Sequence, residues 1–188
     1  MEKSDIFNQS QSIEFILSET ELFGRSCELT PPEAMRLRLL AEETLSLTVR
    51  LFEHLTYTMQ VENTKKRFAI ILDVATLVDS DQKDKVLSLS SKGKNKATGI
   101  LGKISDAFSS LLINNTEAYQ FGGTYDSHYN EDNKDTLFSL KYYKNSVKNE
   151  NKKPEWDGLE KSIIAHYADD VTIGVKSDKV EVIATIIL

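Results

Sequence analysis

The segment from Thr30 to about Leu55 constrains the fold most, because it has both a start signal and a helical periodicity. Thr30 can cap the helix, Pro31 and Pro32 suit its first turn, and Glu33 completes the spacing of a capping box. At about 100° per residue, the side chains divide into two faces. The predicted buried face holds Leu37, Leu40, Ala41, Thr44, Thr48, Leu51 and Leu55. The predicted solvated face holds Arg38, Glu42, Ser46, Arg50 and Glu53. Glu43 and Leu47 lie on the border between the two faces.

Two strands are predicted directly after this helix. Residues 57–62 alternate between apolar and polar side chains, whereas residues 67–75 are nearly all apolar and are expected to form a central strand. Residues 63–66 supply the loop of a hairpin. Alternating residues at 171–175 and 180–186 predict a second hairpin at the end of the sequence.

The other segments complete an α+β pattern. Helices are predicted over about 5–24, ending at Gly24, over 80–89, from Gly99 onward and over 154–167. Residues 136–143 are predicted to form a strand. Residues 122–135 and 144–153 are predicted to be polar connections. Long helices of this kind must cover one face of a mixed β-sheet. We therefore expect one domain over residues 1–188, built as a two-layer sandwich.

Composition narrows the classes of function. The chain of 188 residues has a net charge of −6, which argues against general binding to nucleic acid. Its single cysteine, Cys27, indicates a reducing compartment. No apolar run approaches the ~20 residues of a membrane span. We expect a cytoplasmic protein that binds neither nucleic acid nor membrane.

Two segments could carry chemistry, and Glu42-Glu43 is the first. A carboxylate at the edge of a buried helix face is partly desolvated, and this makes it a better general base. Glu42 points to solvent, so Glu43 is the better candidate. The alternative is that both are ordinary surface charges on an amphipathic helix.

The second segment is a glycine-spaced, lysine-rich loop that leads into a helix. Free backbone N–H groups at a helix start, together with ammonium groups, can bind phosphate. Its candidate residues are Lys92, Gly93, Lys94, Asn95, Gly99, Gly102 and Lys103. It is not a P-loop, because Ala97 and Ile104 occupy positions that need Gly and Ser or Thr. The alternative is a basic loop with a glycine at the helix start.

The order of these segments resembles the GHKL family of ATP-binding domains, which includes histidine kinases and gyrase. The similarity is greatest to the small anti-sigma-factor serine kinases, and it covers about residues 30–118. The family implies a Bergerat-type fold, in which helices cover one face of a mixed sheet. It also implies a helix with Glu-x-x-x-Asn, whose Glu activates water or substrate and whose Asn holds Mg²⁺. An Asp after a strand binds adenine, and a glycine loop wraps the phosphates.

The resemblance places Glu43 on the catalytic Glu and Leu47 on the Asn. Asp73 is the nearest match to the adenine Asp, although neither following glycine is present. Gly99, Gly102 and Lys103 match the phosphate loop, and the preceding loop from Lys92 to Asn95 would add contacts to ATP or ADP. Leucine cannot ligate Mg²⁺, so the metal is not expected, and phosphoryl transfer would lack charge compensation.

Two functions follow from this resemblance. The first is an anti-sigma-like regulator that binds ATP or ADP and has weak or no kinase activity. The second is a catalytically dead scaffold that serves as a protein-interaction module without nucleotide. An active enzyme would be a serine/threonine kinase or ATPase of the GHKL type. Either function implies a protein partner, and a homodimer is left open.

Overall fold

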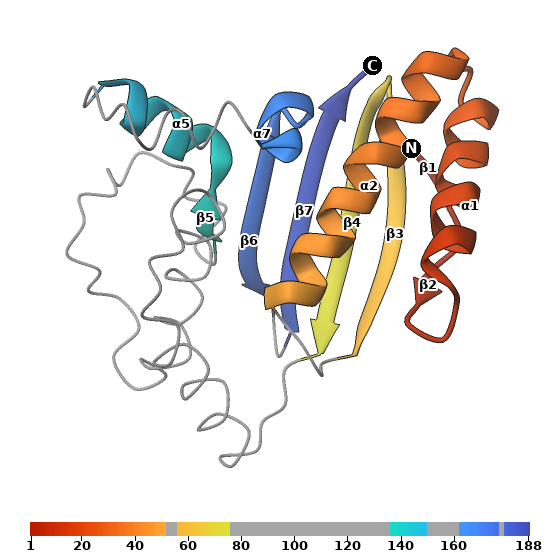
Figure 1. Ribbon diagram of the computed structural model, residues 1–188, viewed down its shortest axis with the longest axis horizontal. Helices are drawn as coiled ribbons and strands as arrows, with labels where there is room; N and C mark the ends of the chain where they lie inside the picture. Colours follow the sequence, from red (N-terminus) through yellow and green to blue (C-terminus); the bar gives the residue numbers. More distant parts are fainter. Residues whose placement is uncertain (52–55, 76–135, 150–161, 177–178) are drawn as a thin grey trace.

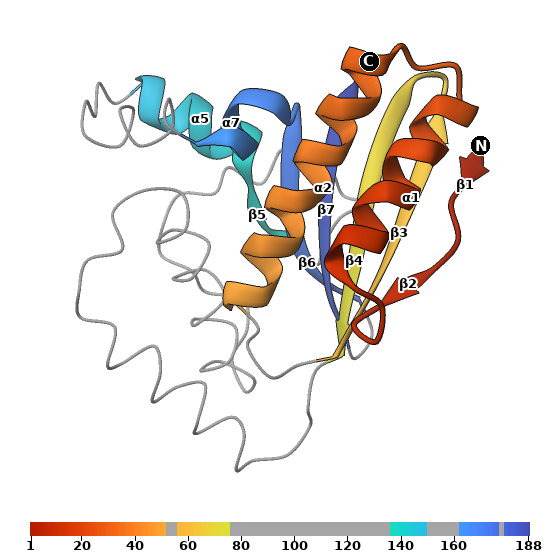
Figure 2. The same ribbon diagram turned by 45° about the vertical axis from the view of Figure 1, so that its right-hand side comes forward.

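The computed structural model describes residues 1–51, 56–75, 136–149, 162–176 and 179–188. These residues form an α+β structure in which α1, α2 and α7 lie on one face of an antiparallel sheet (Figures 1 and 2). The strands are β1 (Glu2–Lys3), β2 (Phe7–Asn8), β3 (Tyr57–Thr64), β4 (Arg67–Ala75), β5 (Thr136–Ser139), β6 (Asp170–Lys176) and β7 (Lys179–Ile187). The helices are α1 (Ile13–Ser26), α2 (Pro31–Leu51), α5 (Leu140–Asn149) and α7 (Ile163–Tyr167).

The sheet has the order β1-β3-β4-β7-β6-β5, and β2 also pairs with β3. Every pairing among the described strands is antiparallel, so the expectation of a mixed sheet is wrong for this part of the chain. Short turns force this direction within the hairpins β3–β4 and β6–β7. Both hairpins were predicted from the sequence, and both are present. The central pairing of β4 with β7 joins them over the full length of both strands, from Arg67↔Ile187 to Ala75↔Lys179.

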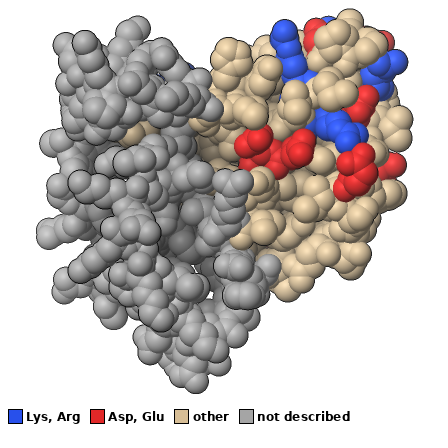
Figure 3. Space-filling model, viewed as in Figure 1, with Lys and Arg blue, Asp and Glu red and all other residues tan. Residues whose placement is uncertain are grey.

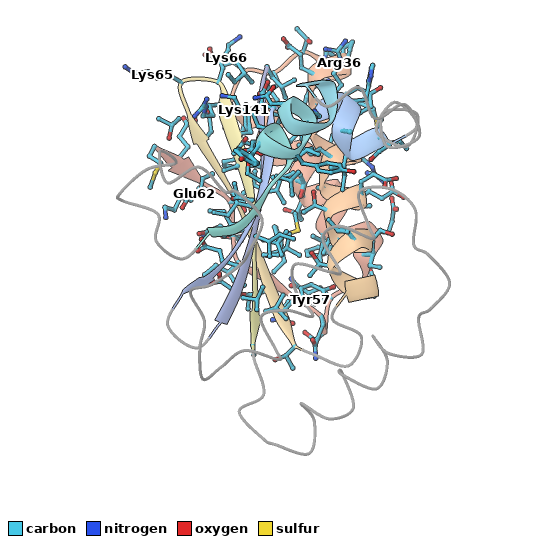
Figure 4. The ribbon with its side chains drawn as sticks, turned by 90° about the vertical axis from the view of Figure 1, so that its left-hand side faces the viewer. Arg36, Tyr57, Glu62, Lys65, Lys66 and Lys141 are labelled. Carbon is cyan, nitrogen blue, oxygen red and sulfur yellow. The ribbon has the colours of Figure 1, made fainter. Side chains whose placement is uncertain are left out.

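The turn of the β3–β4 hairpin is tighter than the predicted loop. Lys65 and Lys66 have φ angles of 51° and 65°, as the two central residues of a type I′ turn require. The Asn63 side chain accepts a hydrogen bond from the backbone N–H of Lys66 at 3.0 Å and helps to hold this conformation. Figure 4 shows Lys65 and Lys66 at one end of the sheet and Tyr57, the first residue of β3, at the other.

The core lies between the sheet and the helices. Alternate strand residues face the helices and are buried: Met59, Val61, Phe68, Ile70, Leu72, Val74, Val171, Ile173, Val180, Val182, Ala184 and Ile186. The predicted buried face of α2 is confirmed for Leu37, Leu40, Ala41, Thr44 and Thr48. The hydroxyls of both threonines donate to backbone carbonyls one turn earlier, at 2.6 and 2.8 Å, which satisfies these polar groups within the core.

The start of α2 confirms one half of the capping box predicted from the sequence, the return of Glu33 to Thr30. The backbone N–H and the hydroxyl of Thr30 both donate to the Glu33 carboxylate, at 2.8 and 2.6 Å. These bonds lower the pKa of Glu33. Arg38 differs from the prediction of a solvated side chain, because it reaches across to α1 and binds Glu14 at 2.7 Å and Glu21 at 3.4 Å. It therefore ties the two helices together.

The N-terminal helix starts later than predicted. The helix α1 begins at Ile13, where the Ser12 hydroxyl accepts a hydrogen bond from the N–H of Phe15 at 3.2 Å. The preceding residues form β1 and β2 along the edge of β3, and Phe7 is buried. An apolar pair at Ile6 and Phe7 fitted a helical spacing, but Phe7 pairs with Met59 of β3 instead.

The predicted stop at Gly24 is also wrong, because α1 continues to Ser26. The helix ends in a Schellman motif, in which the N–H of Leu29 donates to Gly24 and that of Glu28 donates to Arg25, both at 3.1 Å. Glu28 takes the left-handed position, with φ at 65°. Gly24 serves a different purpose, since a Cβ there would lie 3.1 Å from the side chains of Leu29 and Leu37.

The later elements agree with the prediction only in part. The strand expected over 136–143 ends at Ser139, and the polar connection expected after it is helical as far as Asn149. The described portion of the helix predicted over 154–167 begins at Ile163, after a cap at Ser162. The helices predicted at 80–89 and from Gly99 lie outside the described residues. Within the described residues, no helix is both long enough and apolar enough to cross a membrane.

The left-handed conformation of Glu28 gives a prediction about stability. Replacing Glu28 with Gly removes the steric cost of positive φ and should raise the free energy of unfolding by roughly 0.5–1 kcal/mol. The matched control is Arg25→Gly, an exposed position within α1, which should lower it by about 1 kcal/mol. Urea denaturation of both variants measures the difference, and two changes of the same sign would contradict the assigned helix end.

Candidate functional site

Glu43 lies on the flank of α2 that faces away from α1. At about 100° per residue, Glu43 is rotated by roughly 140° from Arg38, the residue that binds α1. Leu40 and Leu47, one turn before and after Glu43, are buried, while Glu43 is half-buried. Glu42 is exposed, as predicted. The helix therefore presents one partly covered carboxylate on the flank away from α1, and α7 also contacts this helix (Figure 1).

Leu47 was expected at the border of the two faces, and the structure buries it. Only 3% of its surface is exposed. Its position, one turn after Glu43, thus belongs to the hydrophobic core. An oxygen ligand for a hard cation cannot come from this side chain.

Asp73 points away from the helices. It lies between Leu72 and Val74, which are both buried on the helix-covered face, so the alternation of β4 directs Asp73 to the opposite face. Its neighbours in the sheet are Thr58 on β3 and Glu181 on β7. Glu43 and Asp73 thus lie on opposite sides of the sheet, and the structure does not bring them together.

The remaining sequence candidates lie outside the described residues. They are Lys92, Gly93, Lys94, Asn95, Gly99, Gly102 and Lys103. The proposed phosphate loop therefore stays a prediction. Among the residues that the structure does describe, no group of three or more His, Cys, Asp or Glu side chains could hold a metal ion.

A polar cluster at the junction of α5, α7 and β6 was not predicted as a unit. Lys144 on α5 donates to the carbonyl oxygens of Ala165 at 2.6 Å and Ala168 at 3.4 Å, at the C-terminal end of α7. Burial lowers the pKa of Lys144, and the carboxylates of Asp170 and Asp169 oppose that change. A cation at this helix end also complements the helix dipole.

The other half of the cluster caps α5. The Ser139 hydroxyl lies 3.1 Å from both carboxylate oxygens of Asp170, and it accepts a hydrogen bond from the N–H of Tyr142 at 3.2 Å. Asp170 also accepts from the N–H of Lys141 at 2.9 Å. A serine and a carboxylate at a helix start satisfy its free N–H groups. The arrangement joins α5 to β6 rather than activating the serine as a nucleophile, because Asp170 has no imidazole between it and the hydroxyl.

Cys27 lies in a third polar group, where the end of α1 meets β1 and β3. Its thiol hydrogen-bonds to Glu2, which also accepts from the Asn63 amide at 2.7 Å. Burial and the Glu2 carboxylate raise the pKa of Cys27, whereas the bonds from Cys27 and Asn63 lower that of Glu2. A thiol that stays protonated is a poor nucleophile. These surroundings therefore favour an unreactive Cys27.

The sequence carried only weak signals for these clusters. Lys144 is one of several lysines in a polar stretch, and nothing local distinguishes it from a solvated residue. Its partners are carbonyl oxygens more than 20 residues away, which no spacing pattern can reveal. Ser139 could have been recognised as a helix cap before Leu140, but the strand was predicted to continue to Tyr143.

Comparison with protein-family models, curated protein sequences and solved structures found no match to this chain.

The Lys144 contacts predict a specific loss of stability. Lys144→Met keeps the length of the side chain but leaves the carbonyls of Ala165 and Ala168 without this donor, so the free energy of unfolding should fall by about 1–2 kcal/mol. Lys141→Met is the matched control, since its exposed side chain lies on the same helix. Urea denaturation should show little change for the control. Equal losses in both variants would mean that the bonds of Lys144 contribute nothing specific.

Proposed function

We propose that this chain is a regulatory protein-binding domain on a GHKL-like scaffold and that it does not transfer phosphate. The observation that carries the proposal is the burial of Leu47, which is 3% exposed. The resemblance matches this position to the residue that would hold Mg²⁺. A hydrocarbon side chain fixed in the core supplies no ligand, so the charge of a transferring phosphoryl group has no metal to compensate it.

The position of Asp73 supports the same proposal. An adenine ligand and the catalytic carboxylate of one site must reach the same bound nucleotide. Asp73 and Glu43 instead lie on opposite sides of the sheet. If the chain has a GHKL-like ancestry, its adenine contact does not come from Asp73.

The order of the elements is compatible with the scaffold. The long helix α2 precedes the β3–β4 hairpin, and the later β6–β7 hairpin returns to pair with β4. Helices cover one face of the resulting sheet (Figure 2). A Bergerat-type fold is therefore proposed on the basis of the motif order and of the helices on one face of the sheet, although the described strand pairings are all antiparallel, whereas that fold has a mixed sheet.

Binding of ATP or ADP is the second candidate function. The observation that favours it is the half-buried position of Glu43 on a flank of α2 that α1 leaves uncovered. Gly99, Gly102 and Lys103, with the lysines of the preceding loop, would then bind the phosphates. Active phosphoryl transfer ranks below both proposals because of Leu47.

Isothermal titration separates these functions. Under the first proposal, ATP and ADP at millimolar concentration give no heat of binding with or without Mg²⁺, because Leu47 and Asp73 supply neither metal nor adenine contacts. Saturable heat with either nucleotide would favour the second candidate, and Gly102→Asp should then weaken binding by placing a carboxylate beside the phosphates.

A separate assay tests catalysis. Radiolabelled ATP should transfer no phosphate to this chain or to a serine-containing acceptor peptide. If transfer occurs and Glu43→Ala abolishes it while the exposed neighbour variant Glu42→Ala does not, the chain is a kinase and the first proposal fails.

A further inference from the structure

The outer face of α1 combines exposed apolar side chains with acidic surroundings. Phe15 and Leu22 are 46% and 60% exposed. They are seven residues apart, so they lie on the same side of the helix, separated by roughly 10 Å. Ile6, which is 64% exposed, precedes the buried Phe7, and the ring of Phe7 makes an edge contact with Phe15 at a centroid distance of 6.3 Å. We call Phe15 and Leu22 the α1 patch.

The α1 patch faces away from the rest of the described molecule. On α1, Ile16 and Thr20 are fully buried, and Glu14 and Glu21 turn toward Arg38 of α2. At about 100° per residue, Phe15 and Leu22 lie on the side of the helix opposite to its buried residues, Ile16, Leu17, Thr20 and Gly24. Both ribbon views place α1 at the margin of the structure, on the far side of α2 from α5 (Figures 1 and 2).

Apolar exposure is concentrated in this part of the chain. Of the nine exposed large apolar residues among the described positions, five precede Phe23: Met1, Ile6, Ile13, Phe15 and Leu22. Single exposed apolar residues are normal on a protein surface, whereas a local concentration marks an interaction site. Figure 3 shows mostly uncharged atoms over the start of α1, with charged side chains gathered above them.

The charge around the patch is negative. Residues 1–30 contain six carboxylate side chains and two cationic ones, a net charge of −4, and two of the six, Glu14 and Glu21, pair with Arg38 of α2. Glu19 lies one turn from both Phe15 and Leu22, while Arg25 is the only Lys or Arg on α1. Lys3 is paired with Glu62 of β3, which leaves less positive charge to balance the carboxylates.

We propose that the α1 patch binds a cationic amphipathic helix of a partner protein. The apolar side chains would pack against the apolar stripe of that helix, and its lysines or arginines would lie beside Glu19 and its acidic neighbours. A second copy of this chain is disfavoured, because isologous contact would bring the same carboxylates together. The inference rests on the proposed protein-binding function and names its surface and partner class.

The test uses the full chain and a defined peptide probe. The probe is a 21-residue peptide with Leu at heptad positions a and d, Lys at e and g, and Ala elsewhere, labelled for fluorescence anisotropy. A scrambled peptide of the same composition carries equal charge without an apolar stripe. The native chain should bind the amphipathic probe at least tenfold more tightly than the scrambled one. Equal affinity for the two peptides would overturn the proposal, since only non-specific charge attraction would remain.

Variants locate the contact. The double substitution Phe15→Ser with Leu22→Ser should weaken binding of the probe at least tenfold. Met35→Ser with Val49→Ser is the matched control, because these residues of α2 are 45% and 42% exposed. The control should keep native affinity, and an equal loss in both double variants would place the contact elsewhere and overturn the assignment.

A charge reversal tests the same surface without removing an apolar contact. Glu19→Lys should weaken the cationic probe severalfold and strengthen binding of a twin peptide with Glu at positions e and g. No change for either peptide would also overturn the proposal. These outcomes are independent of the nucleotide titration. Binding of a nucleotide would contradict the proposed function. Binding of the peptide away from α1 would contradict only the assignment of this surface and would leave the proposed function unchanged.

Discussion

The pairing of β4 with β7 is the contact on which the rest of the described structure depends. It joins two hairpins that are separated by more than 90 residues of chain, and its register runs without a shift from Arg67↔Ile187 to Ala75↔Lys179. A one-residue slip would turn every buried side chain of one hairpin to the opposite face. Ile70 and Ala184, which face the helices from these two strands, hold the register because both must enter the same core.

The helical layer follows from this register. The covered face of the sheet offers a row of aliphatic side chains, and the buried stripe of α2 packs against it. Two contacts link α1 to α2. Arg38 of α2 binds the carboxylates of Glu14 and Glu21. Gly24 of α1 has no side chain, so the side chains of Leu29 and Leu37 can pack closely against it. An exposed ion pair adds little stability, but Arg38 is only 20% exposed and bridges two partners, so it also fixes the relative position of the helices.

Local signals predicted a large part of this fold, because they depend only on neighbours in sequence. Residue periodicity and turn residues predicted the capping box at Thr30, the buried face of α2 and both hairpins. The face of Asp73 was not predictable, since β4 is apolar on both sides at Ala69 and Ile71 and its alternation is hidden. The end of α1 was missed because Gly24 is a typical stop, whereas Glu28 in a left-handed conformation is not.

The candidate site was harder to predict than the fold, because its parts must meet in space. The family resemblance aligned Glu43, Leu47 and Asp73 along the sequence, but the alternation of β4 sends Asp73 to the other side of the sheet. The resemblance matched Leu47 to a metal ligand, whereas the structure places this side chain in the hydrophobic core.

The polar groups that the core does contain are already used to hold elements together. Thr44 and Thr48 bond to the backbone of their own helix, Lys144 caps α7, and Asp170 caps α5. A catalytic site needs polar groups that are positioned but not consumed by the fold. In the described part of the chain, these side chains have structural partners, whereas the apolar side chains Ile13, Phe15 and Leu22 of α1 are exposed. Among the described residues, the proposed binding of a partner protein therefore rests on this exposed surface and not on a polar site in the core.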